Sequence, residues 1–440
     1  MNVEIVNTGS ELMLGRVLNT HQQWLCRRLA DLGHVVTRQV AVADTGNEIQ
    51  NAVREALARA ELVITTGGLG PTSDDITREL IAQLLGRKLV HSAQVQAHIE
   101  AFFAKRGRPR PNMTDVETFV PEGSLVFLNQ TGTAPGLAIQ VAPAGNQAGE
   151  LSKEENRKQA ESAQDRNLRT SSAKQWLIML PGPPRELRPM FDDAVVPLLR
   201  REFAKEIFVC RTLRSTGIGE SRVQEMIEAD VAPFVKQGLQ VGYCARPGAV
   251  DVRLVADGAP APQLVQAATA AVELALSPNI YGYDDDEIEA VVVRLLTEQK
   301  KSLALAESCT GGNIGHRITN VPGASTVFFG GVTSYANSAK EHLLGVRRET
   351  LLKHGAVSEP VAREMAAGAR EKFQSDFALA VTGIAGPDGG TPEKPVGTVF
   401  IALATADGVT VESRLNPWDR ITFKDVTATQ ALELLRRRLL

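Results

Sequence analysis

Short apolar runs alternate with helical patterns near the start of the chain, and this alternation is the feature that most restricts its fold. Strand-like Val3 to Asn7 and Val35 to Val42 flank a helical pattern from about Thr20 to Leu32, and a second helical pattern, about Glu48 to Ala60, precedes strand-like Leu62 to Thr66. Such βαβ units build a sheet of parallel strands covered by helices, and ligands are expected at the loops after the strands' carboxyl ends. The sequence therefore predicts an α/β fold.

The last third shows the same alternation without a sequence repeat. Its expected elements are helix 288–299, strand 302–306, a helix after Gly312, strand 326–334, helix 359–373, and strands 377–382 and 398–404. Between the two α/β ends, residues 207–256 show a strand, helix, strand, strand pattern that fits a small α+β module. We therefore expect two three-layer α/β domains, at residues 1–203 and 287–440, joined by a small α+β module at residues 204–286. The polar stretch at about 144–175 is predicted to be a surface insertion.

Composition and charge exclude several classes of protein. At 440 residues the chain is longer than one hydrophobic core usually supports, so we expect more than one domain. Its 43% hydrophobic and 22% charged residues are typical of globular proteins. With a net charge of −3, the chain as a whole does not attract nucleic acid or anionic lipid electrostatically. There is no signal-peptide pattern and no membrane-spanning run, so we expect a cytoplasmic protein. The four cysteines are far apart and the histidines lack metal-ligand spacing, so neither a disulfide framework nor a histidine-built metal site is expected.

The run Ala306-Glu307-Ser308-Cys309-Thr310-Gly311-Gly312 stands where a strand stops and a helix starts. A serine at that turn presents its hydroxyl to a cleft, and the two glycines let backbone N–H groups approach a ligand beside the positive end of the helix. The alternative reading is a Ser/Thr helix cap followed by a glycine turn. Spacing alone favours this alternative.

Two further motifs follow strands of the same predicted sheet. Tyr335 to Lys340, reading Tyr-Ala-Asn-Ser-Ala-Lys, lies at the next strand-to-helix transition, and Thr382 to Gly390 is a glycine-rich loop after another strand. Each alone has an ordinary explanation, because a lone helical lysine is usually solvated and a glycine-rich loop is usually a turn. The carboxyl ends of parallel strands meet at one edge of a sheet, so the polar groups of these motifs are expected there together.

Taken together, the three motifs and the later run Pro392-Glu393-Lys394-Pro395-Val396-Gly397-Thr398 resemble the nicotinamide mononucleotide deamidase domain of the CinA family. The resemblance covers nearly all of residues 287–440. It implies hydrolysis of nicotinamide mononucleotide to nicotinic acid mononucleotide and ammonia, without a cofactor. The nucleophile would be Ser308, activated by Lys340 and Tyr335. The implied substrate-binding residues are Thr310, Gly311, Gly312, Asn337, Thr382, Gly383, Gly386 and Arg420.

A serine without a histidine can be activated by a lysine, provided that the lysine is neutral. An amine with the ordinary pKa of about 10.4 is neutral at pH 7 only about once in two thousand, which costs roughly 4 to 5 kcal/mol. We therefore expect the environment of Lys340 to lower its pKa. Cys309 is the rival nucleophile, because a helix N-terminus can activate a thiol.

In the first domain, Thr65 to Glu79 joins a buried strand to a helix through a glycine-rich loop suited to phosphate. It matches neither a Walker A loop nor a G-x-G-x-x-G fingerprint, and Thr72 to Asp75 also fits a helix-capping pattern. With Gly9-Ser10-Glu11-Leu12, Gly132 to Gly136 and Leu180-Pro181-Gly182-Pro183-Pro184, the loop resembles the CinA N-terminal domain, which is related to the molybdopterin-binding fold. The resemblance implies a nucleotide site at Gly67, Gly68, Gly70 and Gly182, and metal-dependent ADP-ribose pyrophosphatase activity with Asp74 and Asp75 as candidate ligands of a divalent metal.

Two features qualify that picture. Where the family carries basic-polar residues this chain has Asp115 and Glu117, which should repel phosphate. The middle module, with Gly217-Ile218-Gly219-Glu220-Ser221, resembles the family's KH-like module but lacks a basic G-x-x-G clamp, so we expect a connector or dimerisation role and a homodimer rather than RNA binding.

Two rivals to the amidase interpretation remain. One is a pyrophosphatase with an inactive C-terminal domain, and the other is a non-enzymatic accessory factor in competence or DNA repair. Only local basic runs such as Arg436-Arg437-Arg438 favour the second rival. We expect small-molecule nucleotides, and neither nucleic acid nor membrane, as binding partners.

Overall fold

The computed structural model describes residues 1–141, 175–203 and 207–440. Contacts divide the chain into two compact units, residues 1–206 and 207–440, and each is described here by itself. The surface insertion expected at about 144–175 lies, apart from its last residue, outside the described residues.

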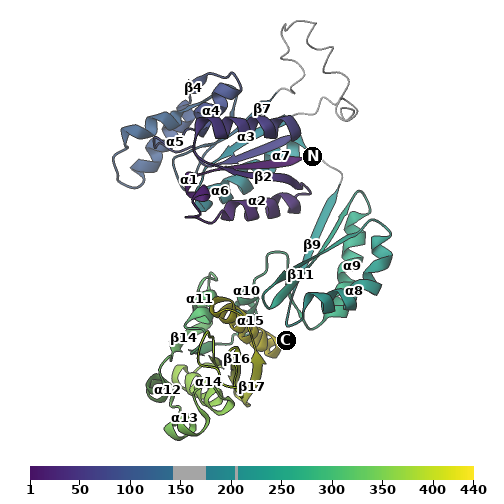
Figure 1. Cartoon of the computed structure of the whole chain (residues 1–440), viewed down its shortest axis with the longest axis vertical. Helices are drawn as coiled ribbons and strands as arrows, with labels where there is room; N and C mark the ends of the chain where they lie inside the picture. The colour runs from purple at the N-terminus through teal and green to yellow at the C-terminus, as the bar shows by residue number, and fades with distance from the viewer. Residues whose placement is uncertain (142–174, 204–206) are drawn as a thin grey trace. The chain divides into compact units, whose positions relative to one another are not determined.

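The first unit is built on a six-stranded sheet (Figure 1). Four neighbouring strands are parallel, and the last two are antiparallel to their neighbours. In sheet order these are β2 (Val36–Val42), β1 (Val3–Thr8), β3 (Leu62–Thr66), β8 (Gln175–Leu180), β7 (Gly136–Val141) and β6 (Leu125–Phe127). The parallel part agrees with the βαβ pattern, and the antiparallel edge makes the sheet mixed.

Helices cover both faces of this sheet because successive strand residues point to opposite sides. Ile5 and Ile64 pack in one core with α2 (Thr20–Asp31), α6 (Pro184–Met190) and α7 (Val196–Glu202). Val6 and Val63 pack in the other core with α3 (Gly46–Arg59), α4 (Thr77–Leu84) and α5 (Ala93–Ala104). The short elements are α1 (Ser10–Met13), the paired strands β4 (Leu89–His91) and β5 (Phe119–Pro121), a 3-10 helix at Asn112–Thr118 and a π-helical turn at Phe191–Val195.

The second unit begins with a four-stranded antiparallel sheet packed against two helices (Figure 1). Its order is β10 (Gln240–Arg246), β11 (Ala249–Asp257), β9 (Phe208–Thr216) and β12 (Ile280–Tyr283), and its helices are α8 (Glu220–Val235) and α9 (Ala261–Leu276). This is the expected α+β module. Helix α9 and strand β12 lie beyond residues 207–256, the stretch whose pattern predicted the module.

The rest of the second unit is a five-stranded sheet with helices on both faces. Its order is β14 (Phe328–Thr333), β13 (Leu303–Glu307), β15 (Phe377–Gly383), β16 (Thr398–Thr405) and β17 (Gly408–Leu415). The first three strands are parallel, whereas β16 and β17 form an antiparallel hairpin that the pattern of helices and strands did not predict. A connection as short as that between β16 and β17 can only join antiparallel strands.

Side-chain size differs sharply between the two faces of this sheet. Leu303 and Leu305 of β13 pack with α10 (Ile288–Glu298), α11 (Asn313–Thr319) and α15 (Arg420–Leu439). Ala304 and Ala306 face α12 (Asn337–Leu344), α13 (Arg348–His354) and α14 (Glu359–Phe373). On that side a Cβ atom added to Gly368 of α14 would lie 1.8 Å from the carbonyl oxygen of Leu344.

The predicted fold class, two three-layer α/β domains and a small α+β module, is confirmed.

Candidate active site

Ser308 stands at the carboxyl end of β13, where the chain leaves the sheet. Its backbone N–H donates to the carbonyl oxygen of Val381 in neighbouring β15 at 3.0 Å, which continues the sheet pairing by one residue. Only 9% of Ser308 is exposed. The main chain therefore fixes the serine at the sheet edge, and the expected strand-to-helix turn is present.

Lys340 reaches Ser308 from the first turns of α12. Its Nζ atom donates to Ser308 Oγ at 3.2 Å, to the carbonyl oxygen of Ser334 at 2.7 Å and to that of Tyr335 at 3.3 Å. The residue is 1% exposed, and all three of these partners are uncharged oxygen atoms. Burial lowers the pKa of Lys340, although the Cys309 thiol opposes part of the shift. The site thus provides a serine hydroxyl beside an amine that loses its proton more readily than an exposed lysine does.

Cys309 does not share this environment. The thiol is buried in the core that α10, α11 and α15 form on the sheet. Burial raises the pKa of Cys309 to about 12, so the reactive thiolate is scarce near neutral pH. These observations argue against the rival nucleophile.

Three residues that were expected to bind substrate use their polar groups for hydrogen bonds within the protein. Glu307 accepts hydrogen bonds from Thr310 Oγ1 at 2.7 Å and from the Gly312 N–H at 3.0 Å, and the Gly311 N–H donates to the Ser308 carbonyl oxygen. None of Thr310, Gly311 and Gly312 lines the pocket beside Ser308. In this structure the Glu307 carboxylate accepts from two of these residues and the Ser308 carbonyl oxygen accepts from the third, so their role in substrate binding stays a prediction.

Tyr335 and Arg420 meet at the rim of the site. Arg420 donates from Nη2 to the Tyr335 hydroxyl at 2.6 Å and from Nη1 to the Gly386 carbonyl oxygen at 2.9 Å. Tyr335 is 61% exposed and contributes only its backbone carbonyl to Lys340. In the described part of the chain, no hydrogen bond joins the Tyr335 hydroxyl to Ser308 or Lys340, so the expected activation of Ser308 by this hydroxyl has no direct contact behind it.

These groups surround a pocket of about 290 Å³. Of the expected binding residues it is lined by Asn337, Thr382, Gly383, Gly386 and Arg420, in addition to Ser308, Tyr335 and Lys340. The Thr382 hydroxyl donates to the carbonyl oxygen of Ala356 at 2.8 Å, so it orders the wall of the pocket. Ala356 and Val357, between α13 and α14, also line the pocket, and nothing in the sequence marked these two small apolar loop residues.

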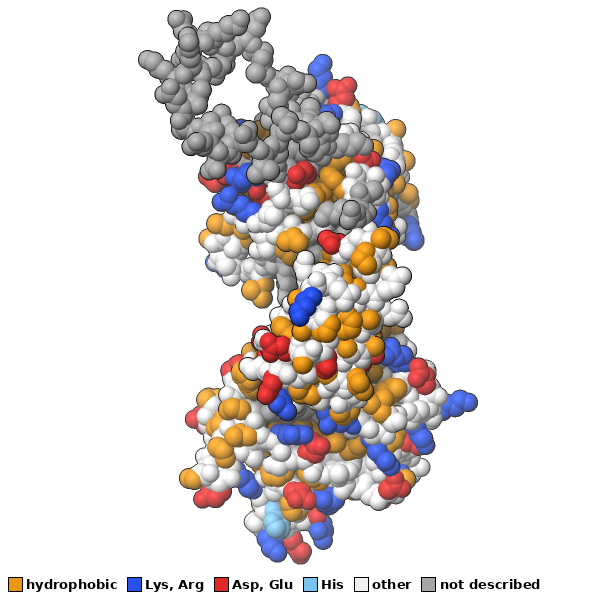
Figure 2. All heavy atoms as spheres, turned by 90° about the vertical axis from the view of Figure 1, so that its right-hand side faces the viewer, with side chains coloured by type: hydrophobic (Ala, Val, Ile, Leu, Met, Phe, Trp, Pro, Cys, Tyr) orange, Lys and Arg blue, Asp and Glu red, His pale blue; other side chains and the backbone are white. Residues whose placement is uncertain are grey.

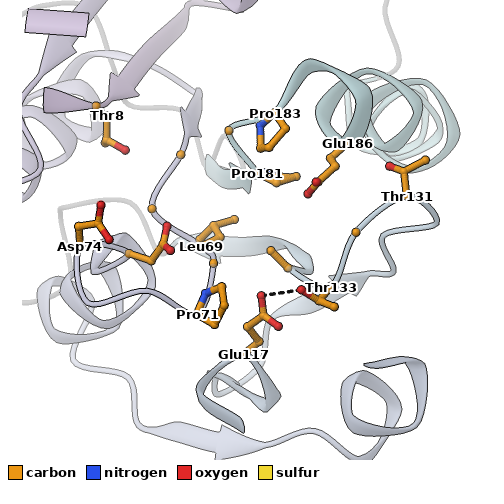
Figure 3. Close-up of a pocket in the computed structure, with 18 of the residues that line it drawn as sticks. Thr8, Leu69, Pro71, Asp74, Glu117, Thr131, Thr133, Pro181, Pro183 and Glu186 are labelled. Carbon is orange, nitrogen blue, oxygen red and sulfur yellow. Dashed lines mark hydrogen bonds between the residues drawn. The ribbon is translucent and has the colours of Figure 1, made fainter. Parts of the chain in front are cut away.

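The first unit has a larger cavity, of about 480 Å³, at its own glycine-rich loop (Figure 3). Gly67, Gly68, Gly70 and Gly182 all line it, as expected. Gly68 has a φ of +66°, and a Cβ atom there would lie 2.0 Å from Thr77 Oγ1, so the loop requires glycine at this point.

The candidate metal ligands Asp74 and Asp75 also line this cavity. The Thr72 hydroxyl bonds to both carboxylates, and the Thr72 N–H donates to Asp75 Oδ2 at 3.0 Å. Hydrogen bonding by Thr72 lowers the pKa of Asp74. Across residues 1–141, 175–203 and 207–440, no group of three or more acidic, histidine or cysteine side chains is arranged to hold a metal ion. Thr72 thus holds both carboxylates in the turn before α4, whose N-cap residue is Ile76.

The two acidic residues expected to repel phosphate have different positions. Asp115 forms an ion pair with Arg110, and it does not line the cavity. Glu117 is fully buried, lines the cavity and accepts a hydrogen bond from Thr133 Oγ1 at 3.1 Å, as Figure 3 shows. Its Oε2 atom has no hydrogen-bond partner among the described residues. Burial, assisted by Asp75 and Glu186, raises the pKa of Glu117 to about 7 against the opposing effects of Thr133 and Arg78.

Known proteins match all parts of the chain. The family model of the CinA C-terminal domain matches residues 285–439, that of the damage-inducible protein CinA KH domain residues 210–282, and that of a probable molybdopterin binding domain residues 4–201. No helix in the described ranges is long and apolar enough to cross a membrane.

Similar proteins extend over the full length. A CinA-like protein of Akkermansia muciniphila is 41% identical over 98% of this chain and 96% of its own length, and a putative competence-damage inducible protein of Caldicellulosiruptor bescii is 40% identical over the whole of both. A solved competence/damage inducible protein of Agrobacterium tumefaciens is 39% identical over 35% of this chain and 96% of its own, with a TM-score of 0.33. With relatives this similar over its full length, the chain belongs to the CinA family.

Proposed function

We propose that the C-terminal domain hydrolyses the carboxamide of nicotinamide mononucleotide, which gives nicotinic acid mononucleotide and ammonia. The observation that carries this proposal is the contact of 3.2 Å between Ser308 Oγ and the Nζ atom of Lys340, a buried lysine bonded to uncharged oxygen atoms. A lysine held in this way can serve as the base that a serine nucleophile needs.

The reaction follows in two halves. Neutral Lys340 takes the hydroxyl proton while Ser308 Oγ bonds to the carboxamide carbon, and the tetrahedral intermediate then expels the amide nitrogen. Protonated Lys340 returns its proton to that nitrogen, so ammonia leaves and an ester on Ser308 remains. Water, deprotonated by the same lysine, attacks the ester, and Lys340 then returns this proton to Ser308 Oγ as the bond to the acid product breaks.

The charge of the substrate assists this cycle. A pyridinium ring carries a fixed positive charge, and a cation near Lys340 disfavours protonation of the amine, in the same direction as burial. The same charge makes the carboxamide carbon a better electrophile. Measurement of the Lys340 pKa with and without a non-hydrolysable nucleotide tests this coupling, and an unchanged pKa contradicts it.

Arg420 is the group proposed to bind the phosphate of the nucleotide. Its guanidinium lines the pocket and uses one nitrogen for Tyr335 and another for Gly386, which leaves N–H donors for an anion. Arg317, on α11, is instead paired with Glu289 at 2.7 Å and bonded to Thr429. It is therefore a packing residue.

A second activity, metal-dependent hydrolysis of ADP-ribose, is proposed for the cavity of the first unit. The glycine-rich loop suits a diphosphate, but the lining side chains include one arginine, Arg185, and six carboxylates: Glu11, Asp44, Asp74, Asp75, Glu117 and Glu186. An anionic ligand, a molybdopterin phosphate included, is repelled by this lining unless a cation accompanies it. A diphosphate with a divalent ion fits the charge, and Asp74 and Asp75 are the residues proposed to hold that ion.

A non-enzymatic role in competence or DNA repair is the candidate from another class, and the names of the relatives are its main support. Two carboxylates offset most of the charge of the basic run that favoured it, because Arg436 and Arg437 both pair with Glu433 and Arg438 pairs with Asp407. Basic and acidic side chains are also interspersed over the face shown in Figure 2. DNA affinity with a steep dependence on salt would revive this role.

One assay separates these functions. The full chain is incubated with nicotinamide mononucleotide and, separately, with ADP-ribose, each with and without a divalent metal. We expect metal-independent ammonia release from the first substrate and metal-dependent cleavage of the second. Asp74→Asn with Asp75→Asn should abolish only the cleavage of ADP-ribose. Absence of ammonia with the wild-type protein contradicts the amidase proposal, and equal loss of both activities in the double variant contradicts two separate sites.

A further inference from the structure

Glu307, the last residue of β13, is a buried carboxylate directly before the proposed nucleophile. It is 3% exposed, and both of its oxygen atoms accept hydrogen bonds from the segment that follows Ser308. The donors to Oε2 are Thr310 Oγ1 at 2.7 Å, the Gly312 N–H at 3.0 Å and the Ile314 N–H at 3.1 Å, and the donor to Oε1 is the Gly315 N–H at 2.8 Å. One side chain therefore holds the whole turn from the strand into α11.

The main chain of Glu307 leads to the other member of the site. Its carbonyl oxygen accepts the N–H of Ser334 at 2.8 Å, and the carbonyl oxygen of Ser334 accepts Lys340 Nζ at 2.7 Å. Glu307 thus joins the loop that carries Ser308 to the residue that orients Lys340.

An ordinary helix cap would not require this arrangement. The N-cap residue of α11 is Gly312, which has no side chain, and a serine or aspartate there would satisfy the free amides locally. Burying a carboxylate costs several kcal/mol, and it is tolerated here because four donors satisfy it. The buried carboxylate serves the site directly, because Glu307 precedes Ser308 and its hydrogen bonds hold both ends of the turn that carries the serine.

We propose that Glu307 is a positioning residue that keeps Ser308 Oγ within reach of Lys340. The inference rests on the proposed function of this site. Since both carboxylate oxygens are already engaged with the protein, Glu307 acts through the loop and does not touch the substrate. Without these acceptors, Ser308 Oγ should move away from Lys340 Nζ. A displacement of about 1 Å in such a site lowers the rate on the order of a hundredfold.

The variant Glu307→Gln tests this, because an amide has the same shape but offers one acceptor oxygen and turns an N–H₂ group toward protein donors. We expect kcat for ammonia release to fall at least about tenfold with KM changed less than about twofold. Thr310→Val, which removes one donor and keeps the carboxylate, should lower kcat by a smaller factor. The matched control is Glu433→Gln, which alters a carboxylate that is 6% exposed on α15, and it should leave kcat unchanged.

A second measurement is independent of nicotinamide mononucleotide. A fluorophosphonate bonds to an activated serine oxygen with loss of fluoride, and intact-mass spectrometry measures the rate. Glu307→Gln should label at Ser308 at least about tenfold more slowly than wild type and Glu433→Gln. Equal labelling rates, or an unchanged kcat in Glu307→Gln, overturn the positioning role while the proposed function stands. If the wild type is not labelled at Ser308, or releases no ammonia, the activated serine itself is refuted.

Discussion

Each of the two α/β domains has a glycine-rich loop after a parallel strand. The domains differ in the charge of the titratable side chains that are buried beside this loop. In the first unit the loop after β3 opens on a cavity lined by six carboxylates, with a fully buried Glu117. In the second, the loop after β13 lies beside the buried amine of Lys340, which donates to three uncharged oxygen atoms. Topology thus fixes where a site forms, and the buried titratable group decides what chemistry it supports.

The largest effect should come from the nucleophile. Ser308→Ala removes the atom that forms the covalent intermediate, so ammonia release should fall by at least about a thousandfold, as it does when serine hydrolases lose their nucleophile. Cys309→Ala, the neighbouring control, removes a thiol whose pKa is raised to about 12 and should cost far less. Initial rates distinguish the two. An inactive Cys309→Ala together with a largely active Ser308→Ala would reverse the assignment.

The second effect tests the buried amine. Lys340→Arg keeps a positive charge but cannot deprotonate near neutral pH, so turnover should fall by about a hundredfold or more. In the wild type, burial lowers the pKa of Lys340, so the rate should fall as pH drops through that lowered pKa and should reach its plateau below the pH expected for an ordinary lysine. Initial rates against pH give both results. Partial retention in Lys340→Arg would indicate an electrostatic role without proton transfer.

The third effect concerns stability in the first unit. The pKa of Glu117 is raised from 4.5 to about 7, so between these values the folded chain keeps a proton that the unfolded chain loses. Its contribution to stability is therefore complete below about pH 4.5 and is lost as pH rises through about 7, a change of up to about 3 kcal/mol. Glu117→Gln should remove this decline.

Unfolding can be followed by fluorescence in a Trp418→Phe background, because the remaining tryptophans, Trp24 and Trp176, lie in the first unit. The matched control is Asp115→Asn, which changes an exposed carboxylate on the same 3-10 helix and should keep the wild-type pH dependence. Parallel stability curves for Glu117→Gln and wild type would show that the carboxyl is not perturbed.

The smallest effect separates a binding role from a catalytic one at Tyr335. Tyr335→Phe removes the hydroxyl that accepts from Arg420 and leaves the backbone carbonyl that accepts from Lys340. We expect KM to rise by roughly fivefold and kcat to stay nearly constant, since a single hydrogen bond contributes about 1 kcal/mol. Steady-state kinetics give both constants. A large fall in kcat would restore the activating role that the family resemblance implies.

Much of the fold was predictable from the sequence, because alternating strand and helix patterns are local signals. Motifs at the ends of parallel strands also converge by topology, and Ser308 and Lys340 do meet as this rule requires. The antiparallel strands β7 and β17 were harder to predict, since partner choice depends on contacts far along the chain. The sequence also left open whether Lys340 is solvated, which only burial decides.

The rest of the site depends on the direction of individual side chains and backbone donors. Glu307 carried one faint signal, an acidic residue at the end of an apolar strand, where burial of a charge needs several donors. The donors are mostly backbone amides, which look alike in every sequence. Tyr335 shows the opposite case, because its hydroxyl turns to Arg420, a residue 85 positions away. No local pattern could specify that pairing.

The unequal faces of the C-terminal sheet set how this domain can change over evolutionary time or in the laboratory. On the leucine face, exchanges among aliphatic residues of similar volume can be absorbed by repacking. On the alanine face, Ala304 and Ala380 pack with α14, and α14 in turn lies so close to α12 that a Cβ atom at Gly368 would clash with the Leu344 carbonyl oxygen. Variation there must proceed by coordinated changes, so diversity in this domain should accumulate on the leucine side and in the loops.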